Sequence, residues 1–124
     1  MSQSGLGLLL RTLREGRRLS LREAGQLSTI DHAYIYRLEK GEKESPSLDL
    51  LGRLLKVLKP GEREAEMAKW LAEHEANADW VEHVLADPSL TAEMFEMGAS
   101  IRHRGNVRPD MNTLEARVRK ALEE

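Results

Sequence analysis

Residues 13–40 read LREGRRLSLREAGQLSTIDHAYIYRLEK, and the fold can be predicted from this stretch. Ser20 is followed three residues later by Glu23, which is the capping-box pattern that begins a helix. Asp31 can accept hydrogen bonds from the first N–H groups of a second helix, which Gly41 would end. The joint between these two helices is too short for them to run antiparallel. Such a pair is typical of a helix-turn-helix, whose second helix lies in the major groove of DNA.

Apolar residues on either side of this stretch are spaced for further helices. Residues 6–15 show the i, i+3, i+4, i+7 spacing of one buried helical face, and Gly16 would end that helix. Ser45-Pro46-Ser47 would open another helix after Gly41. We expect these side chains to face the core: Leu6, Leu9, Leu10 and Leu13; Leu21, Ala24 and Leu27; Ile30; Tyr34, Ile35 and Leu38; Leu48, Leu51, Leu54, Leu55 and Leu58.

The order of these features resembles the Cro/C1 (XRE) family of helix-turn-helix transcription regulators. The resemblance rests on L-R-x-x-x-x-LS, the LRE triplet, the Y-I-x-R-L-E-x-G run and PSLDLL, and it extends from about Leu6 to Leu58. The chain departs from the family pattern at Gly25, where Ala is usual, and at Thr29, where Gly is frequent. The resemblance implies an all-α fold with an N-terminal lambda-repressor-like domain.

The same resemblance implies which residues contact DNA. An arginine can pair with guanine through two hydrogen bonds, and an alanine can contact the methyl group of thymine. The implied base-reading residues are His32, Ala33, Tyr36 and Arg37. The implied phosphate contacts are Ser20, Arg22, Lys40, Lys43 and Ser45. An ion pair between Arg14 and Glu39 would join the first helix to the end of the third.

The charges are divided unevenly along the chain. Through Leu58 there are ten Lys or Arg and seven Asp or Glu, a net charge of +3. From Lys59 onward there are nine basic and fourteen acidic residues, a net charge of −5, so the sum is −2 for all 124 residues. The basic excess therefore accompanies the segment expected to bind DNA, where it would neutralise phosphates.

The sequence argues against several other classes of protein. It contains no cysteine, so we expect neither a disulfide framework nor a thiolate zinc site. No apolar run approaches the roughly 20 residues that span a membrane, and we expect a cytoplasmic protein at a bacterial or phage nucleoid. His74 and Glu75 do not continue as H-E-x-x-H, and no nucleophile motif or phosphate-binding loop appears. We therefore expect no enzyme, no metal and no cofactor.

Residues 61–124 are expected to form a second, all-helical domain after a DNA-binding domain over residues 1–60. A domain of about 60 residues buries little apolar surface by itself, so a second copy would help to cover it. A single helix-turn-helix also needs a twofold partner to reach two half-sites. The residues expected at the dimer interface are Trp70, Trp80, Phe95, Leu114, Val118 and Leu122.

Two fragments of the second half, LADPSL and SIRHRGNVRPD, resemble the C-terminal domain of DdrO-type damage-response repressors. That resemblance implies dimerisation through this domain and inactivation by a partner metallopeptidase of the ImmA kind. Aligned on the shared I-x-x-R-G pattern, the resemblance implies cleavage of the bond between His103 and Arg104. Gly105 lowers local helix stability, so the extended geometry that proteases require is accessible there by fraying. Related pairs of a repressor and a protease also occur in mobile elements and in anti-phage defence.

These patterns together predict a homodimeric, sequence-specific repressor that binds a double-stranded DNA operator. The alternative is an antitoxin or adaptor whose C-terminal domain binds a protein partner, since many antitoxins share this N-terminal module. A neighbouring protease gene would favour the first function, and a neighbouring toxin gene would favour the second.

Overall fold

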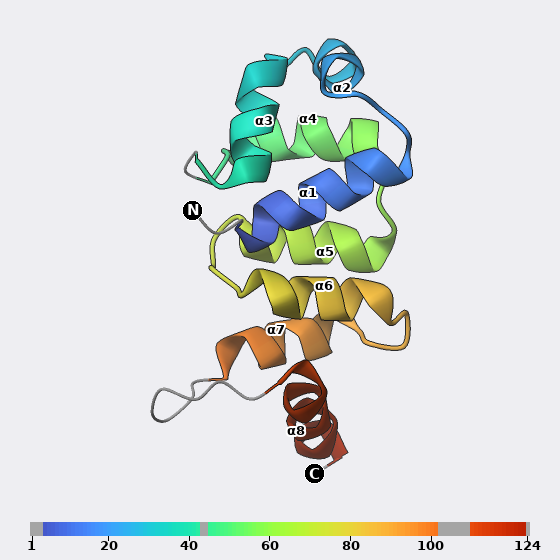
Figure 1. Ribbon diagram of the computed structural model, residues 1–124, viewed down its shortest axis with the longest axis vertical. Helices are drawn as coiled ribbons and strands as arrows, with labels where there is room; N and C mark the ends of the chain where they lie inside the picture. The colour runs from blue at the N-terminus through green and yellow to red at the C-terminus, as the bar shows by residue number, and fades with distance from the viewer. Residues whose placement is uncertain (1–3, 43–44, 102–109, 124) are drawn as a thin grey trace.

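The computed structural model describes residues 4–42, 45–101 and 110–123, and these residues form eight α-helices and no strand (Figure 1). The all-α fold expected from the sequence is therefore confirmed. The helices are α1 (Gly5–Gly16), α2 (Leu21–Ser28), α3 (His32–Lys40), α4 (Leu48–Leu58), α5 (Glu62–Leu71), α6 (Ala78–Ala86), α7 (Ala92–Ser100) and α8 (Met111–Glu123).

The predicted helix caps are present around α2 and α3. The Glu23 N–H donates to the Ser20 hydroxyl, and the Ser20 N–H donates to the Glu23 carboxylate, each over 3.0 Å. Asp31 accepts a hydrogen bond of 3.0 Å from the Ala33 N–H at the start of α3. Gly41 ends α3 in the left-handed conformation, with φ 75°. These local signals fix where both helices of the motif begin and where the second one ends.

The turn between α2 and α3 contains a residue in the left-handed conformation and accepts hydrogen bonds from a side chain of α4. Thr29 ends α2 with φ 57° and ψ 37°, a left-handed conformation that β-branched residues rarely adopt. The Arg53 guanidinium of α4 donates to the Thr29 carbonyl over 2.7 Å and to the Ser28 carbonyl over 3.2 Å. Arg53 thereby satisfies carbonyl groups that the end of α2 leaves without helical partners.

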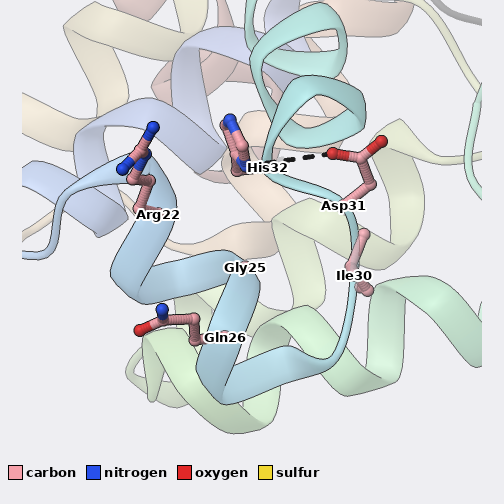
Figure 2. Close-up of a pocket in the computed structure, with 6 residues that line it drawn as sticks. All are labelled: Arg22, Gly25, Gln26, Ile30, Asp31 and His32. Carbon is pink, nitrogen blue, oxygen red and sulfur yellow. Dashed lines mark ion pairs between the residues drawn. The ribbon is translucent and has the colours of Figure 1, made fainter.

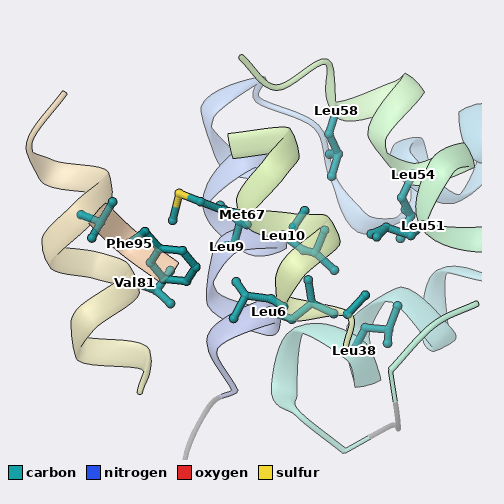
Figure 3. Packing of buried hydrophobic residues seen from close by; sticks show 14 of the residues in the cluster. Leu6, Leu9, Leu10, Leu38, Leu51, Leu54, Leu58, Met67, Val81 and Phe95 are labelled. Atoms are coloured by element: carbon teal, nitrogen blue, oxygen red, sulfur yellow. The ribbon is translucent and has the colours of Figure 1, made fainter. Parts of the chain in front are cut away.

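Helix α1 lies at the centre of the molecule. It contacts α3 on one side and α5 and α6 on the other. Figure 3 shows its Leu6, Leu9 and Leu10 between leucines of α3 and α4 and the apolar side chains of α5, α6 and α7. Buried residues before and after residue 60 belong to this one cluster. The domain boundary at residue 60 stays a prediction.

Helix α1 also approaches α3 unusually closely. A Cβ atom added at Gly7 would lie 2.5 Å from the Glu39 carbonyl oxygen and 2.7 Å from the Leu38 carbonyl oxygen. Any larger residue at this position would push against the backbone of α3. Gly7 is therefore the point at which α1 fixes the position of the C-terminal end of α3.

Two leucines expected in the core lie on the surface, and that part of the prediction is wrong. Leu27 is 64% exposed and Leu48 is 67% exposed. The buried face of α2 consists of Ala24, Gly25 and Ser28, and at about 100° per residue Leu27 falls to the side of this face. Leu48 is the first residue of α4, and its side chain points back beyond the packed part of the helix.

Four of the six residues expected between two copies instead lie in the chain's own core. Trp80, Phe95, Leu114 and Val118 are each at most 3% exposed. Trp80 donates from its ring N–H to the Phe95 carbonyl over 2.9 Å, which joins α6 to α7. These four side chains have no surface left for a partner, so their placement at a dimer interface is corrected. Among the expected interface residues, partly exposed surface remains on the other two, Trp70 and Leu122.

Candidate nucleic-acid interface

Helix α3 has one apolar face toward the core and one polar face toward solvent. Ile35 and Leu38 are buried, at 2% and 3% exposure. Three of the four predicted base-reading residues are exposed, and Ala33 is partly buried; the exposed ones are His32, Tyr36 and Arg37. The Lys40 ammonium lies 5.6 Å from the centre of the Tyr36 ring, a cation–π distance. This arrangement leaves the polar face of α3 exposed to solvent.

The predicted phosphate contacts are distributed around this face. Ser20, Arg22, Lys40 and Ser45 are exposed, whereas Lys43 lies outside the described residues. At Ser20 both the hydroxyl and the N–H are engaged in the capping box with Glu23. Those hydrogen bonds from Ser20 lower the pKa of the Glu23 carboxyl, so this group is negative at neutral pH. A phosphate approaching Ser20 would therefore meet a carboxylate, and the contact predicted at Ser20 stays a prediction.

Arg14 and Glu39 form the expected ion pair beneath this surface. The Arg14 Nε donates to Glu39 Oε2 over 2.7 Å, and Nη2 donates to Oε1 over 2.9 Å. The third nitrogen, Nη1, donates to the Leu19 carbonyl over 2.8 Å. The pair raises the pKa of the Arg14 guanidinium above its ordinary value, chiefly through the hydrogen bond to Glu39. One side chain thus joins α1, the turn before α2 and the end of α3.

Two surface pockets flank the turn of the motif. The pocket between α2 and the start of α3 has a volume of about 320 Å³ and is lined by Arg22, Gly25, Gln26, Ile30, Asp31 and His32 (Figure 2). The second has a volume of about 390 Å³ and is lined by Thr29, Ile30, Asp31, Tyr34, Arg37, Leu50 and Arg53.

Sequence reasoning missed Gln26 and Arg53 near this interface. Gln26 could have been found, because it lies one helical turn after Arg22 and so shares its face of α2. Arg53 gave no such signal, since its role depends on how α4 crosses the turn.

Other kinds of site are not evident in the described part of the chain. No group of three or more His, Cys, Asp or Glu side chains there could hold a metal ion. Over the same residues, no helix has the length and apolar character that crossing a membrane requires. The bond between His103 and Arg104, the expected cleavage site, lies outside the described residues.

The caps, the short turn and the exposed polar face of α3 define a DNA-binding regulator of the helix-turn-helix class. The family model of the helix-turn-helix domain matches residues 5–68, which are 64 of the 124 residues, and the chain belongs to this family. The match includes α1 to α4 and continues into α5. No curated protein matches the sequence. The resemblance of the second half to DdrO-type repressors is not confirmed by these comparisons.

Proposed function

We propose that this protein is a sequence-specific transcriptional repressor that binds a DNA operator as a homodimer. The main support is that side chains of other helices hold α3 in place at both of its ends. Arg53 holds the turn before α3, and the Arg14–Glu39 pair holds its last turn. A rigid helix with an exposed polar face can read base edges without a large entropic cost on binding.

The base-reading residues keep the roles that the family resemblance implies. Arg37 pairs with a guanine, Ala33 contacts a thymine methyl group, and Tyr36 lies along the phosphates. Arg22, Lys40, Lys43 and Ser45 contact the backbone on either side of the groove. His32 stands at the edge of this set, next to α2.

Dimerisation is proposed because one copy can read only one half-site. Two half-sites on one face of DNA are about 34 Å apart, and a twofold dimer reads both. Trp70 and Leu122 have partly exposed surface in the C-terminal half, and they support an interface there. The exposed Leu27 and Leu48 provide further apolar surface in the N-terminal half.

In vitro selection from a random duplex library tests this proposal. We expect an enriched palindrome, protected by the protein in footprinting, and a dimer in sedimentation on that duplex. Enrichment of no sequence would overturn DNA readout. A monomer that protects a single half-site would overturn dimerisation but not DNA readout. A small protein that copurifies with a chain unable to bind DNA would favour the adaptor alternative.

We further propose that cleavage by a metallopeptidase relieves repression. Leu114 and Val118 are the buried residues of α8, and this helix packs against α6 and α7. A cut before α8 would uncover apolar surface in the C-terminal half, and it would weaken any interface built there.

A chain truncated after His103 tests this mechanism. It should bind more of a dye specific for apolar surface, sediment as a monomer and release the operator. A truncated chain that dimerises and holds its operator would refute the mechanism.

A further inference from the structure

The pocket between α2 and α3 combines three side chains that can donate hydrogen bonds. Arg22 and Gln26 are one turn apart on α2, and His32 is the first residue of α3. Within the described parts of the chain, the side chains of Arg22 and Gln26 have no hydrogen-bond or ion-pair partner. In Figure 2 the nitrogens of Arg22 and a ring nitrogen of His32 point to the same side of the pocket. The pocket therefore presents donors and lacks an occupant from its own chain.

The backbone around this pocket brings α2 against the start of α3. A Cβ atom added at Gly25 would lie 2.8 Å from the Ile30 carbonyl oxygen and 3.1 Å from the His32 Cβ. Glycine thus allows α2 to contact the start of α3 directly. Because α2 is capped at Ser20 and α3 at Asp31, Arg22 and His32 project from fixed backbone positions near the two helix starts.

The charged and titratable groups near His32 are few. Arg22 faces it from α2, Asp31 precedes it, and Tyr36 follows one turn later on α3. An Asp31 oxygen lies 3.9 Å from His32 Nδ1, beyond hydrogen-bond distance, and the same oxygen already accepts from the Ala33 N–H. The Asp31 carboxylate lies to the side of the imidazole away from Arg22 (Figure 2). The pocket itself is therefore positive once His32 is protonated.

We propose that this pocket binds one backbone phosphate of DNA through Arg22 and His32, with Gln26 lining its other end, and that His32 takes up a proton from solvent when DNA binds. The inference rests on the proposed DNA binding and assigns His32 to the backbone instead of to a base edge. A phosphodiester only accepts hydrogen bonds. A neutral imidazole has one N–H donor and one acceptor nitrogen, whereas the protonated ring has two donors and a positive charge. Histidine changes charge between pH 5 and 8, so affinity for DNA depends on pH in that range.

Affinity measured against pH at constant ionic strength tests the coupling. The unmutated chain should bind a selected duplex more tightly as pH falls from 8 to 6, by at most tenfold per pH unit for each proton taken up, with one proton per half-site. His32→Gln should bind with little dependence on pH. His74→Gln, which changes an exposed histidine of the C-terminal half, is the matched control and should retain the full dependence. A pH dependence that survives in His32→Gln would overturn the proposal.

Neutral methylphosphonate substitutions in the duplex locate the phosphate. At one position in each half-site, the substitution should remove the pH dependence and add no further loss to His32→Gln, because both remove the same contact. Arg22→Gln should lower the salt dependence of binding by about one unit of slope per half-site for every duplex sequence. An altered base preference in His32→Gln would overturn the backbone assignment.

A free anion accepts the same hydrogen bonds as a backbone phosphate, so it is the alternative ligand for this pocket. Competition by inorganic phosphate distinguishes the two ligands. Replacing chloride by phosphate at equal ionic strength should leave the affinity for DNA unchanged. Phosphate that competes with DNA in the unmutated chain, but not in Arg22→Gln, would assign the pocket to a free anion and overturn the proposal. A chain that binds no duplex under any condition would instead refute the proposed function itself.

Discussion

Replacing Glu39 by alanine should destabilise the protein more than any other single change at the interface. In the folded protein the Arg14 and Glu39 side chains are only 13% and 5% exposed. The substitution removes two hydrogen bonds of 2.7 and 2.9 Å and leaves the guanidinium with the Leu19 carbonyl. Removing one member of a buried pair costs about 3–5 kcal/mol. Because Arg14 retains one acceptor and some contact with solvent, we expect a loss near the lower end, about 3 kcal/mol.

Urea denaturation monitored by circular dichroism measures this loss. A loss of about 3 kcal/mol is a large share of the 5–15 kcal/mol typical of folded domains, and the melting temperature should fall by about 10 °C. Arg11→Ala is the matched control, since it removes an ion pair on the same helix α1 whose side chains are 48% and 54% exposed. That pair should contribute less than about 1 kcal/mol.

Two further measurements separate a loss of stability from a loss of DNA reading. At low temperature, where Glu39→Ala remains folded, it should select the same operator sequence, because Glu39 is buried away from the polar face of α3. Replacing Arg14 and Glu39 together by leucine should restore much of the stability, since no uncompensated charge remains. A Glu39→Ala chain as stable as the Arg11→Ala chain would show that the pair does not hold α3 in place.

Three other substitutions test separate parts of the structure. Arg37→Ala should cost about 1–3 kcal/mol of binding free energy at one base position only, measured on duplexes that each differ at one position; a uniform loss over all positions would contradict base reading. Thr29→Gly should stabilise the protein by about 1 kcal/mol in urea denaturation, because the left-handed backbone at Thr29 strains a β-branched residue; a destabilised variant would contradict this account of the turn. Glu115 has its pKa lowered below the ordinary 4.5, first by the hydrogen bond from Arg119 and then by that with His83. Its contribution to stability is therefore present above pH 4.5 and is lost as the pH falls through the lowered pKa, so the stability difference between the unmutated chain and Glu115→Gln should shrink on acidification; a constant difference from pH 6 to 3 would refute the linkage.

The DNA-reading motif could be predicted from sequence because its signals are local. Ser20 and Glu23 lie three residues apart, and Asp31 and Gly41 bracket one helix, so each cap depends on a few neighbouring residues. The buried ion pair came from the family resemblance, since no local pattern joins residues 25 positions apart.

The parts that sequence did not predict depend on long-range packing. Leu27 and Leu48 fit an apolar stripe, but periodicity does not show where the neighbouring helices stop. Trp80 and Phe95 had to be buried, yet burial within one chain and burial between two chains leave the same pattern in sequence. The clamp by Arg53 depends on how α4 crosses the turn, which only the folded structure reveals.

The central position of α1 has a thermodynamic consequence. Its first turn fits between two backbones: a Cβ atom at Gly7 would lie 2.5 Å from the Glu39 carbonyl oxygen, and one at Gly5 would lie 2.9 Å from the Ala76 carbonyl oxygen. Both halves of the chain therefore share the free energy of ordering this single helix. We expect the two halves to unfold in one cooperative transition. A substitution that stabilises or destabilises the packing of α5 and α6 should therefore change the fraction of molecules in which α3 is folded, without altering any contact to DNA.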